Sequence, residues 1–542
     1  MVMSLSRPTE SDQLARGPGF GRAEHVASRI AGALLTAGLL VLSFPSPDQG
    51  WLAWVALVPL LLACQGLGLL AAGALGLLCG FAAAFGIFGW LFEVPGFGMH
   101  HAVLLAVYVA LYPAAWCAGL PALSRARLPL LITAPALWVV LDYVRAHAGF
   151  LALPWATLAH SQHENLAVLQ VASITGEYGV TFLVVMASVA IADLVVRRAW
   201  RSVLIAATAI GLAHAAGAPV LARPDRTAPV QVAVVQPNIQ VEERRTAAGR
   251  TVTLDRLERL TRAAAASRPA VIIWPETAVW DLSRDPALVE RLHGLADAAE
   301  TPLIVGASEV VKFAPEQEGV MVRTRSHNSA YFVEPRRPLG EPYRKIRLVP
   351  FAEYRPLEEI IRWPEWLVPR VHTMTAGEVQ QQFSLSDGAR IGVLICWENL
   401  FADFVRPAVR DGAQLLVQLT NDAWFGRTAA PRQHNLASVL RAVENRTPIV
   451  IASNTGPSQI IDPYGRVVSN IPALFSEEVA ADAVPLGSGG TPYTRFGDFF
   501  ALAALAWLAL GVIVRAVHRF SVREADSRAD AGVRAISKSA HQ

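Results

Sequence analysis

The sequence of 542 residues predicts a protein in two parts: a membrane bundle of about eight transmembrane helices, and a globular α/β domain inserted before the last of them. The first observation is that apolar residues are unevenly spread. Hydrophobic residues make up 53% of the chain and charged residues 17%, yet residues 25–222 and 499–518 hold few of the charges. The second observation is that residues 223–498 alternate short β-branched segments with amphipathic ones, as a globular enzyme does.

About 20 consecutive apolar residues are needed to cross a bilayer. By that criterion the first 222 residues hold seven spans and the C-terminal region one. Arginines precede the first span, as they do in a signal peptide. However, the segment LSFPSPDQG at its C-terminal end offers no small-x-small cleavage site. We favour an uncleaved anchor that follows a cytoplasmic segment at residues 1–24. The eight spans are expected at residues 25–45, 51–67, 69–92, 102–123, 128–145, 166–195, 202–222 and 499–518.

Basic loops indicate which side of the bundle faces the cytoplasm. The segments SRAR at 124–127 and RRAWR at 197–201 are basic, as is the tail at 519–542, whereas SPDQG and EVPGFGMHH contain no lysine or arginine. With eight spans, all the basic segments fall on one side. We therefore expect both termini in the cytoplasm and residues 223–498 on the outer side, which is the periplasm for a bacterial inner membrane.

The loop at 147–166 is predicted on the outer side too. Its His160 and His163 are possible metal ligands, but no carboxylate or cysteine is spaced along the chain to complete a shell. We expect interfacial polar residues there, and no metal or other cofactor in the protein. The net charge of +3 gives no reason to expect nucleic acid as a partner.

Six β-branched segments in residues 223–498 each end in polar residues, and helical stretches such as 251–266 and 286–299 lie between some of them. This alternation is typical of a sheet covered on at least one face. Functional groups in such folds collect where strands end, and Glu276 and Cys396 each lie at such an end. The six segments are VQVAVVQPN, PAVIIWPET, TPLIVGASE, ARIGVLICWEN, AQLLVQLTND and TPIVIASNTG.

Cys396 is the one cysteine outside the apolar stretches, which hold Cys64, Cys79 and Cys117. A lone cysteine is often a packed core residue, but the WEN that follows Cys396 is too polar for an inward continuation of the strand. Lys345 also stands out, because arginines flank it in YRKIRLVPFAEY and the chain has only three lysines. The alternative for Lys345 is a solvated loop charge.

Glu276, Lys345 and Cys396 together suit acyl transfer. A carboxylate can take the thiol proton, the thiolate can attack a carbonyl, and an ammonium can stabilise the oxyanion. No histidine accompanies this set, so a papain-like cysteine–histidine pair is not indicated.

These three residues, in the motifs WPET, YRKIRLVPFAEY and LICWEN, resemble the nitrilase superfamily. LTNDAWFGRTAAPRQHNLASVLRAVENRTPIV, TPYTRFGD, PWATLAHSQ and GEYGVTFLV are similar to the apolipoprotein N-acyltransferase family, as is the eight-span architecture, over about residues 25–520. The resemblance implies an α-β-β-α sandwich for 228–486. It also implies that Cys396 is the nucleophile, Glu276 the general base and Lys345 the oxyanion lysine, supported by Glu353 and Glu398.

The resemblance further implies two lipid-anchored partners. An acyl chain would pass from a membrane phospholipid, through a thioester on the cysteine, to the amine of an N-terminal S-diacylglyceryl cysteine on an apolipoprotein. Beside Cys396, Trp397 stands in place of the family's frequent tyrosine. One local departure concerns the substrate entrance: the family often has an aromatic residue shortly after its VQ-N strand, whereas QPNIQVEERRT has none.

Five aromatic residues are candidate substrate contacts. Trp397 would contact the substrate, Trp424 and Phe425 would line the acyl path, and Trp363 and Trp366, beside charges in PLEEIIRWPEWLVPR, would touch the bilayer. Plain core packing or a surface turn is the alternative for the last four.

Two rival functions stay open from the sequence. A membrane-tethered amidase would share Glu276, Lys345 and Cys396 but pass the acyl group to water. A transporter or receptor would need charges within the bundle, for which Asp142 and Glu177 are the candidates.

Overall fold

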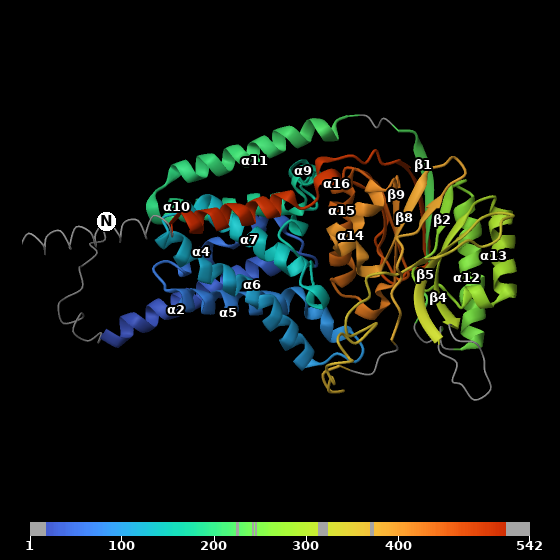
Figure 1. Ribbon diagram of the computed structural model, residues 1–542, viewed down its shortest axis with the longest axis horizontal. Helices are drawn as coiled ribbons and strands as arrows, with labels where there is room; N and C mark the ends of the chain where they lie inside the picture. Colours follow the sequence, from blue (N-terminus) through green and yellow to red (C-terminus); the bar gives the residue numbers. More distant parts are fainter. Residues whose placement is uncertain are drawn as a thin grey trace, which may run out of the picture.

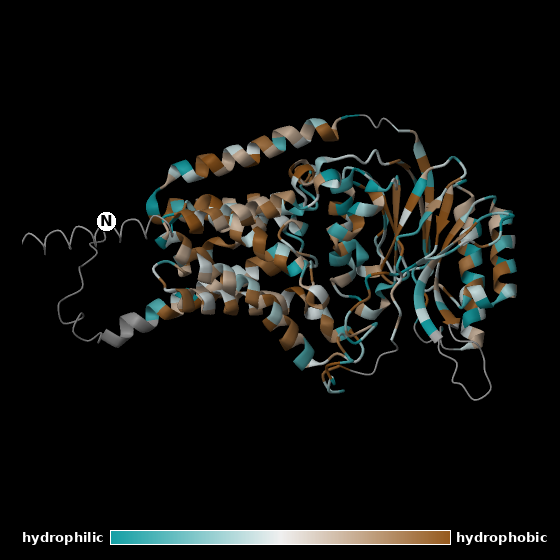
Figure 2. Ribbon diagram, in the orientation of Figure 1, coloured by the Kyte–Doolittle hydropathy of each residue, from teal (hydrophilic) through white to brown (hydrophobic). Residues whose placement is uncertain are grey.

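The computed structural model describes residues 18–223, 227–240, 243, 246–312, 324–368 and 373–515, with side chains from residue 24 onward. A helical bundle and an α/β domain lie side by side (Figure 1). The bundle helices are coloured mostly hydrophobic, whereas hydrophobic colour in the α/β domain concentrates on the strands (Figure 2). The predicted fold class is confirmed.

Five described helices are long and apolar enough to cross a membrane, and other predicted spans fall on shorter helices. Figure 1 shows α11 running along the outside of the bundle, where most of its residues are exposed. The bundle helices are α2 (Pro18–Leu42), α3 (Ala53–Ala56), α4 (Val58–Ala63), α5 (Leu69–Ile87), α6 (Met99–Arg125), α7 (Leu130–Ala146), α8 (Leu166–Leu169), α9 (Ala172–Thr175), α10 (Glu177–Arg197), α11 (Trp200–Leu221) and the last one, Phe499–Arg515.

The prediction of one continuous span at 166–195 was wrong. The chain breaks at Gly176, which has φ of +66° and lies so close to Tyr493 that a Cβ would be 2.7 Å from that ring. Only glycine adopts this conformation readily, so the membrane helix α10 starts anew at Glu177. The second predicted span is likewise split, between α3 and α4, and α2 already begins within the predicted segment 1–24.

The α/β domain contains two packed sheets. The first has the order β13-β1-β2-β4-β5-β6, with β3 beside β4, and the second has the order β12-β11-β10-β9-β8-β7. The strands are β1 (Pro229–Gln236), β2 (Val271–Ile273), β3 (Val279–Trp280), β4 (Leu303–Lys312), β5 (Thr324–Val333), β6 (Tyr343–Arg344), β7 (Gln382–Ser384), β8 (Arg390–Ile395), β9 (Leu415–Thr420), β10 (Ile449–Ser453), β11 (Ser458–Ile461), β12 (Val467–Ile471) and β13 (Glu478–Pro485).

Successive side chains of each strand point to opposite faces of its sheet, and this alternation produces the layers of the domain. Val232 and Ile273 of the first sheet meet Val393 and Val417 of the second in one buried core. Intervening residues of the first sheet, such as Ile272, pack under α12 (Ala247–Ala265) and α13 (Pro286–Ala299). The second sheet is covered by α14 (Ala402–Arg410) and α15 (Ala430–Asn445). The result is the expected α-β-β-α sandwich, with β1, β2, β4, β8, β9 and β10 at the six predicted strands.

Helix α15 lies between the second sheet and the bundle (Figure 1), and charged side chains join it to the bundle. Arg441 is fully buried; its Nη2 lies 2.8 Å from Oε2 of Glu177 on α10, and its Nε lies 3.0 Å from Oε2 of Glu444. The backbone N–H of Glu177 donates to Oε1 of Glu444 at 2.9 Å. Glu177 therefore serves the contact between the two parts, not an open transport path.

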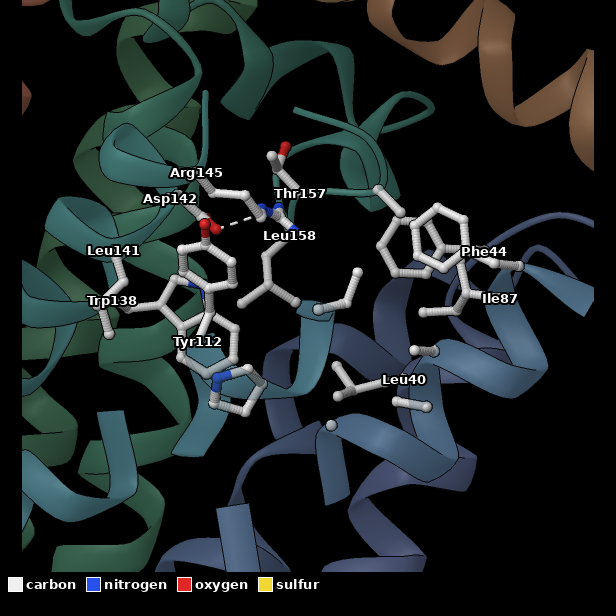
Figure 3. Close-up of a pocket in the computed structure, with 17 residues that line it drawn as sticks. Leu40, Phe44, Ile87, Tyr112, Trp138, Leu141, Asp142, Arg145, Thr157 and Leu158 are labelled. Atoms are coloured by element: carbon white, nitrogen blue, oxygen red, sulfur yellow. Dashed lines mark hydrogen bonds and ion pairs between the residues drawn. The ribbon is translucent and has the colours of Figure 1, made fainter. Parts of the chain in front are cut away.

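Asp142, the other charge considered for transport, pairs with Arg145 at 3.2 Å on α7. Both line a cavity of about 70 Å³ among α2, α5, α6 and α7, whose other walls are largely apolar (Figure 3). Ligand pockets usually measure about 300–1,000 Å³, so this cavity is too small to be a binding site for a transported solute.

We expect Arg441→Met to lower the free energy of unfolding by about 3–5 kcal/mol, because it leaves buried carboxylates without their cation. Denaturant titration of the full chain in detergent measures this change. Arg410→Met is the matched control, since Arg410 and its partner Asp411 are more than half exposed, and it should cost less than about 0.5 kcal/mol. Equal effects of the two substitutions would contradict the interpretation.

Candidate active site

Cys396 stands directly after the buried strand β8, at the first position of the 3-10 turn η7 (Cys396–Leu400). Its φ is +55°, a left-handed conformation that non-glycine residues seldom adopt and that costs about 1–3 kcal/mol. The side chain of Gln418, on the neighbouring parallel strand β9, donates to the Cys396 carbonyl at 3.3 Å. The neighbouring strand thus helps to hold the sharp turn that ends β8 at the thiol.

Lys345 follows β6 and is only 1% exposed, which excludes the solvated loop charge. Its Nζ donates to Oε1 of Glu353 at 2.7 Å and lies 4.0 Å from Oε1 of Glu276. The structure therefore brings Glu276 to Lys345 and Glu353, which lie far from it in sequence, and forms one charged cluster.

Glu276 follows β2 and is 7% exposed. Asn328 on β5 donates to its Oε1 at 2.5 Å. The neighbouring strand β4 can approach because residue 306 is glycine: a Cβ there would lie 2.8 Å from Cα of Glu276. The sequence analysis missed Asn328; the one available signal was its place in the alternating segment TRSHNSAYFV.

The charges in this cluster shift one another's proton affinities. Burial raises the pKa of the Cys396 thiol well above its ordinary value, the charge of Lys345 lowers it, and the charge of Glu276 raises it. Burial also raises the pKa of Glu276, against the effect of Lys345. Although burial lowers the pKa of Lys345, the charges of Cys396, Glu353 and Glu276 raise it further, above its ordinary value.

These directions define what the cluster can do chemically. The ammonium of Lys345 stays charged, and the resting thiol keeps its proton. The nearby carboxylate of Glu276 can receive that proton, and Lys345 can stabilise negative charge on the sulfur or on an attacked carbonyl oxygen.

Glu398 is fully buried and acts as a tether rather than as an open carboxylate. Its Oε1 accepts from the backbone N–H groups of Ile346 and Arg347, at 2.8 and 3.0 Å. Its Oε2 accepts from the hydroxyl of Tyr343 at 2.7 Å and from the N–H of Ile395 at 2.8 Å. It thereby joins the loop that carries Lys345 to the end of the strand that carries Cys396.

Glu353 supports the same loop. Its second oxygen accepts from the backbone N–H of Val349 at 2.7 Å while the first binds Lys345. Both predicted supporting carboxylates therefore lie where they fix the geometry of Lys345.

An open pocket of about 570 Å³ adjoins this loop, within the usual size of ligand pockets. Trp397 lines it beside Arg347, whose carbonyl accepts a hydrogen bond from the indole N–H at 2.6 Å. Phe150 and Phe401 add further aromatic surface. A ligand with apolar groups can therefore lie against Ile346 and Trp397, the residues that directly follow Lys345 and Cys396 in the chain.

The other four aromatic residues predicted as substrate or bilayer contacts differ in their exposure and packing. Phe425 packs edge-on against Trp90 of the bundle, with ring centroids 4.9 Å apart, and Trp424 is 45% exposed. Trp363 packs on Phe351 and donates to the carbonyl of Pro356, as in an ordinary packed turn.

Trp366 is 67% exposed, and its carbonyl lies 2.8 Å from Nε2 of His100 at the start of α6. Residues 369–370, the end of the segment predicted to touch the bilayer, lie outside the described residues.

We expect Cys396 to react slowly with iodoacetamide at pH 7 and faster as the pH rises past 9, because its pKa is raised. Lys345→Met should move this dependence to still higher pH by removing the charge that lowers the pKa. Intact-mass measurement follows the label, and Cys396→Ala identifies the site, since the other cysteines are buried. Rapid labelling that does not vary between pH 6 and 8 would contradict a protonated resting thiol.

Comparisons with known proteins agree with these observations. Residues 231–491 match a family model described as carbon-nitrogen hydrolase, and residues 36–190 match one described as apolipoprotein N-acyltransferase N-terminal domain. Among solved structures, a nitrilase-superfamily protein of Saccharomyces cerevisiae has a TM-score of 0.36 at 17% identity, covering 48% of this chain and 90% of that one.

Three relatives named apolipoprotein N-acyltransferase match over most of their length. The one from Geobacter metallireducens is 37% identical, covering 88% of this chain and 93% of its own. Those from Gloeobacter violaceus and Vibrio vulnificus are 31% and 29% identical, over 89% and 90% of this chain and 94% and 96% of theirs. The chain belongs to the apolipoprotein N-acyltransferase family.

Proposed function

We propose that this protein transfers an acyl chain from a membrane phospholipid to the amine of the N-terminal S-diacylglyceryl cysteine of apolipoproteins, which completes lipoprotein maturation. Family membership supports an acyltransferase. The single observation that carries the proposed mechanism is the buried cluster in which Lys345 lies 2.7 Å from Glu353 and 4.0 Å from Glu276, with its charge acting on Cys396.

In the first step the thiol of Cys396 gives its proton to Glu276, and the sulfur attacks the ester carbonyl of the phospholipid. The oxyanion is stabilised by the ammonium of Lys345. When the tetrahedral intermediate collapses, the C–O bond to glycerol breaks and Glu276 returns the proton to the leaving oxygen. Lysophospholipid departs, and the acyl chain remains on Cys396 as a thioester.

In the second step the neutral amine of the apolipoprotein attacks the thioester and gives a proton to Glu276. The C–S bond breaks, an amide forms, and the thiolate of Cys396 recovers the proton from Glu276. Because an amide is more stable than the starting ester, the reaction needs no external energy source. The scheme is a ping-pong mechanism with a covalent intermediate.

The remaining predicted residues have supporting or contact roles in this proposal. Glu353 and Glu398 hold the loop of Lys345, and Asn328 orients Glu276. Trp397, Trp424 and Phe425 line the path of the acyl chain. The exposed Trp366, together with Ile360, which is 81% exposed, touches the bilayer surface, whereas Trp363 shapes their turn.

The proposed location is the bacterial inner membrane, with both termini in the cytoplasm and the α/β domain in the periplasm. The basic segments at 124–127 and 197–201 support this orientation under the positive-inside rule. It places Cys396 on the side of the outer leaflet, where a phospholipid and a lipid-anchored acceptor both present their polar groups. Anchoring all three in one membrane raises their effective concentration.

Incubation of the purified protein with phospholipid alone should add the mass of one fatty acyl chain. We expect the adduct to be absent in Cys396→Ala and to be released faster by a diacylglyceryl-cysteine peptide than by water. Intact-mass spectrometry measures both. Release at equal rates by water and peptide would favour the amidase, and the absence of any adduct in folded protein would refute the covalent mechanism.

Lys345→Met should slow formation of the adduct by about 100- to 1,000-fold, the effect of losing one oxyanion donor. Single-turnover rates with a fluorescent phospholipid measure it. Lys312, the last residue of β4, provides the matched control as Lys312→Met, which should react at the wild-type rate. A change of less than about threefold in Lys345→Met would remove this lysine from the mechanism.

A further inference from the structure

Two loops of the membrane part bring together three side chains of the types that bind metal ions. Asp48 lies in the turn after α2, whereas His163 and Glu164 precede α8. One ligand atom of each lies within 4.8 Å of the others. The sequence analysis expected no carboxylate or cysteine spaced along the chain to complete a shell around His160 and His163. The structure instead brings Asp48, which is distant along the chain, to His163 and Glu164. His160 is not part of this cluster, since its Nε2 faces Glu177 at 3.3 Å.

The distance between the imidazole and the first carboxylate is that of an ion pair, and it also suits two ligands of one shared cation. Nε2 of His163 lies 3.5 Å from Oδ2 of Asp48, beyond the 2.7–3.2 Å or so of a good N–H···O bond. Two ligand atoms each about 2.1 Å from one tetrahedral zinc ion are about 3.4 Å apart. The pair is therefore spaced as two ligands of one cation would be.

The cluster also lacks other ways to satisfy its polar atoms. Oδ1 of Asp48 is buried without a hydrogen-bond partner, and such atoms are uncommon in folded proteins. Nδ1 of His163 also has no partner, but it lies across the ring from Nε2 and would not contact an ion bound there. Within the part of the chain that the structure describes, the ion-pair partner of Asp48 is His163, not an arginine. The carboxylates of Asp48 and Glu164 thus place negative charge beside an imidazole with no lysine or arginine bound to them.

The backbone on both sides of the cluster is fixed by other contacts. The side chain of Gln162 donates to the carbonyl of Gly50 at 2.7 Å and accepts from the indole N–H of Trp54 at 2.7 Å. The N–H of Asp48 donates to the carbonyl of Phe44 at 2.9 Å. Because neighbouring groups hold the two loops together, binding an ion requires little rearrangement.

We propose that Asp48, His163 and Glu164 bind a divalent transition-metal ion of the zinc class, with water completing its shell. One imidazole with two carboxylates suits zinc, whereas calcium and magnesium prefer oxygen ligands alone. The ion clamps the turn after α2 to the loop before α8. None of its ligands belongs to the cluster around Lys345, so the site is structural and separate from the acyl-transfer chemistry.

The test uses the untagged full chain in detergent, stripped with EDTA and then equilibrated with zinc, manganese or calcium. Plasma mass spectrometry should find about one zinc per chain, and zinc should raise the melting temperature. Glu164→Gln changes an exposed side chain, so it should fold, and it should weaken zinc binding by about tenfold or more, as should Asp48→Asn. His214→Gln, at an exposed histidine of α11, should bind zinc as the wild type does.

Three outcomes would overturn the proposal. The first is equal zinc content in the wild type and in Glu164→Gln, and the second is an equal loss in His214→Gln, which would mean unspecific binding. The third is tighter binding of calcium than of zinc, which would exclude the proposed class of ion. The melting temperature of each metal-free variant separates loss of the site from loss of the fold.

Discussion

One buried ammonium, that of Lys345, is the charge on which the arrangement of the site depends. An unpaired ion in a protein interior costs several kcal/mol, and Glu353 at 2.7 Å offsets that cost by direct hydrogen bonding. Glu276, at 4.0 Å, is close enough to interact with the ammonium yet leaves it room to serve another anion. The dependence is mutual, because without Lys345 the two carboxylates would repel each other and an anionic Cys396 between β8 and β9 would have no nearby cation.

This balance requires segments from different strands to meet accurately, and Glu398 provides that constraint. Four donors from the Lys345 loop and the end of β8 converge on its two oxygens. A carboxylate is the suitable residue here, because it accepts at both oxygens and none of the four groups accepts in return. The left-handed conformation of Cys396 then turns the chain, so that Cys396 and Glu398 can both face inward directly after β8.

The sequence predicted the local elements well and the long-range ones poorly. Period and composition identified strands β1, β2, β4, β8, β9 and β10, since each is a continuous apolar segment buried on both faces. Strands β5, β11, β12 and β13 were not identified, because polar residues interrupt their apolar pattern. They form strands through hydrogen bonds to neighbouring strands, and the sequence does not show that pairing. The break at Gly176 was hidden for a similar reason: the contact with Tyr493, far along the chain, forces it.

The same distinction holds for the site. Glu276, Lys345 and Cys396 were recognisable because each departs from its local pattern: a carboxylate or a thiol at an apolar strand end, and a lysine among arginines. Asn328 gave no such signal, since TRSHNSAYFV holds several other polar residues and a buried one is not distinguishable among them. The burial of Glu398 was equally hidden, because WEN after Cys396 suggests solvent, whereas the glutamate faces the interior.

Helix α15 explains how chemistry in one part is tied to the membrane in the other. Its sequence APRQHNLASVLRAVEN is typical of an exposed helix, yet almost every residue is buried between the second sheet and the bundle. Its polar groups find partners on both sides. The Gln433 amide donates to the carbonyls of Pro45 and Ile87 in the bundle. Arg441 contacts Glu177 of α10 and donates to the carbonyl of Leu400, which ends the turn begun by Cys396.

Because these contacts form only when both parts are present, cutting the α/β domain away would leave Glu177 without its arginine and the Gln433 amide without its acceptors in the bundle. The contact that stabilises the domain therefore also fixes the height of Cys396 relative to the membrane helices. The proposed donor and acceptor are both held in lipid, so a fixed height keeps Cys396 level with their polar groups. A substrate-binding site would otherwise have to provide this positioning. Helix α15 is both polar and buried because it contacts the second sheet on one side and the bundle on the other. Apolar packing alone would allow the two parts to slide, whereas directional hydrogen bonds and ion pairs do not.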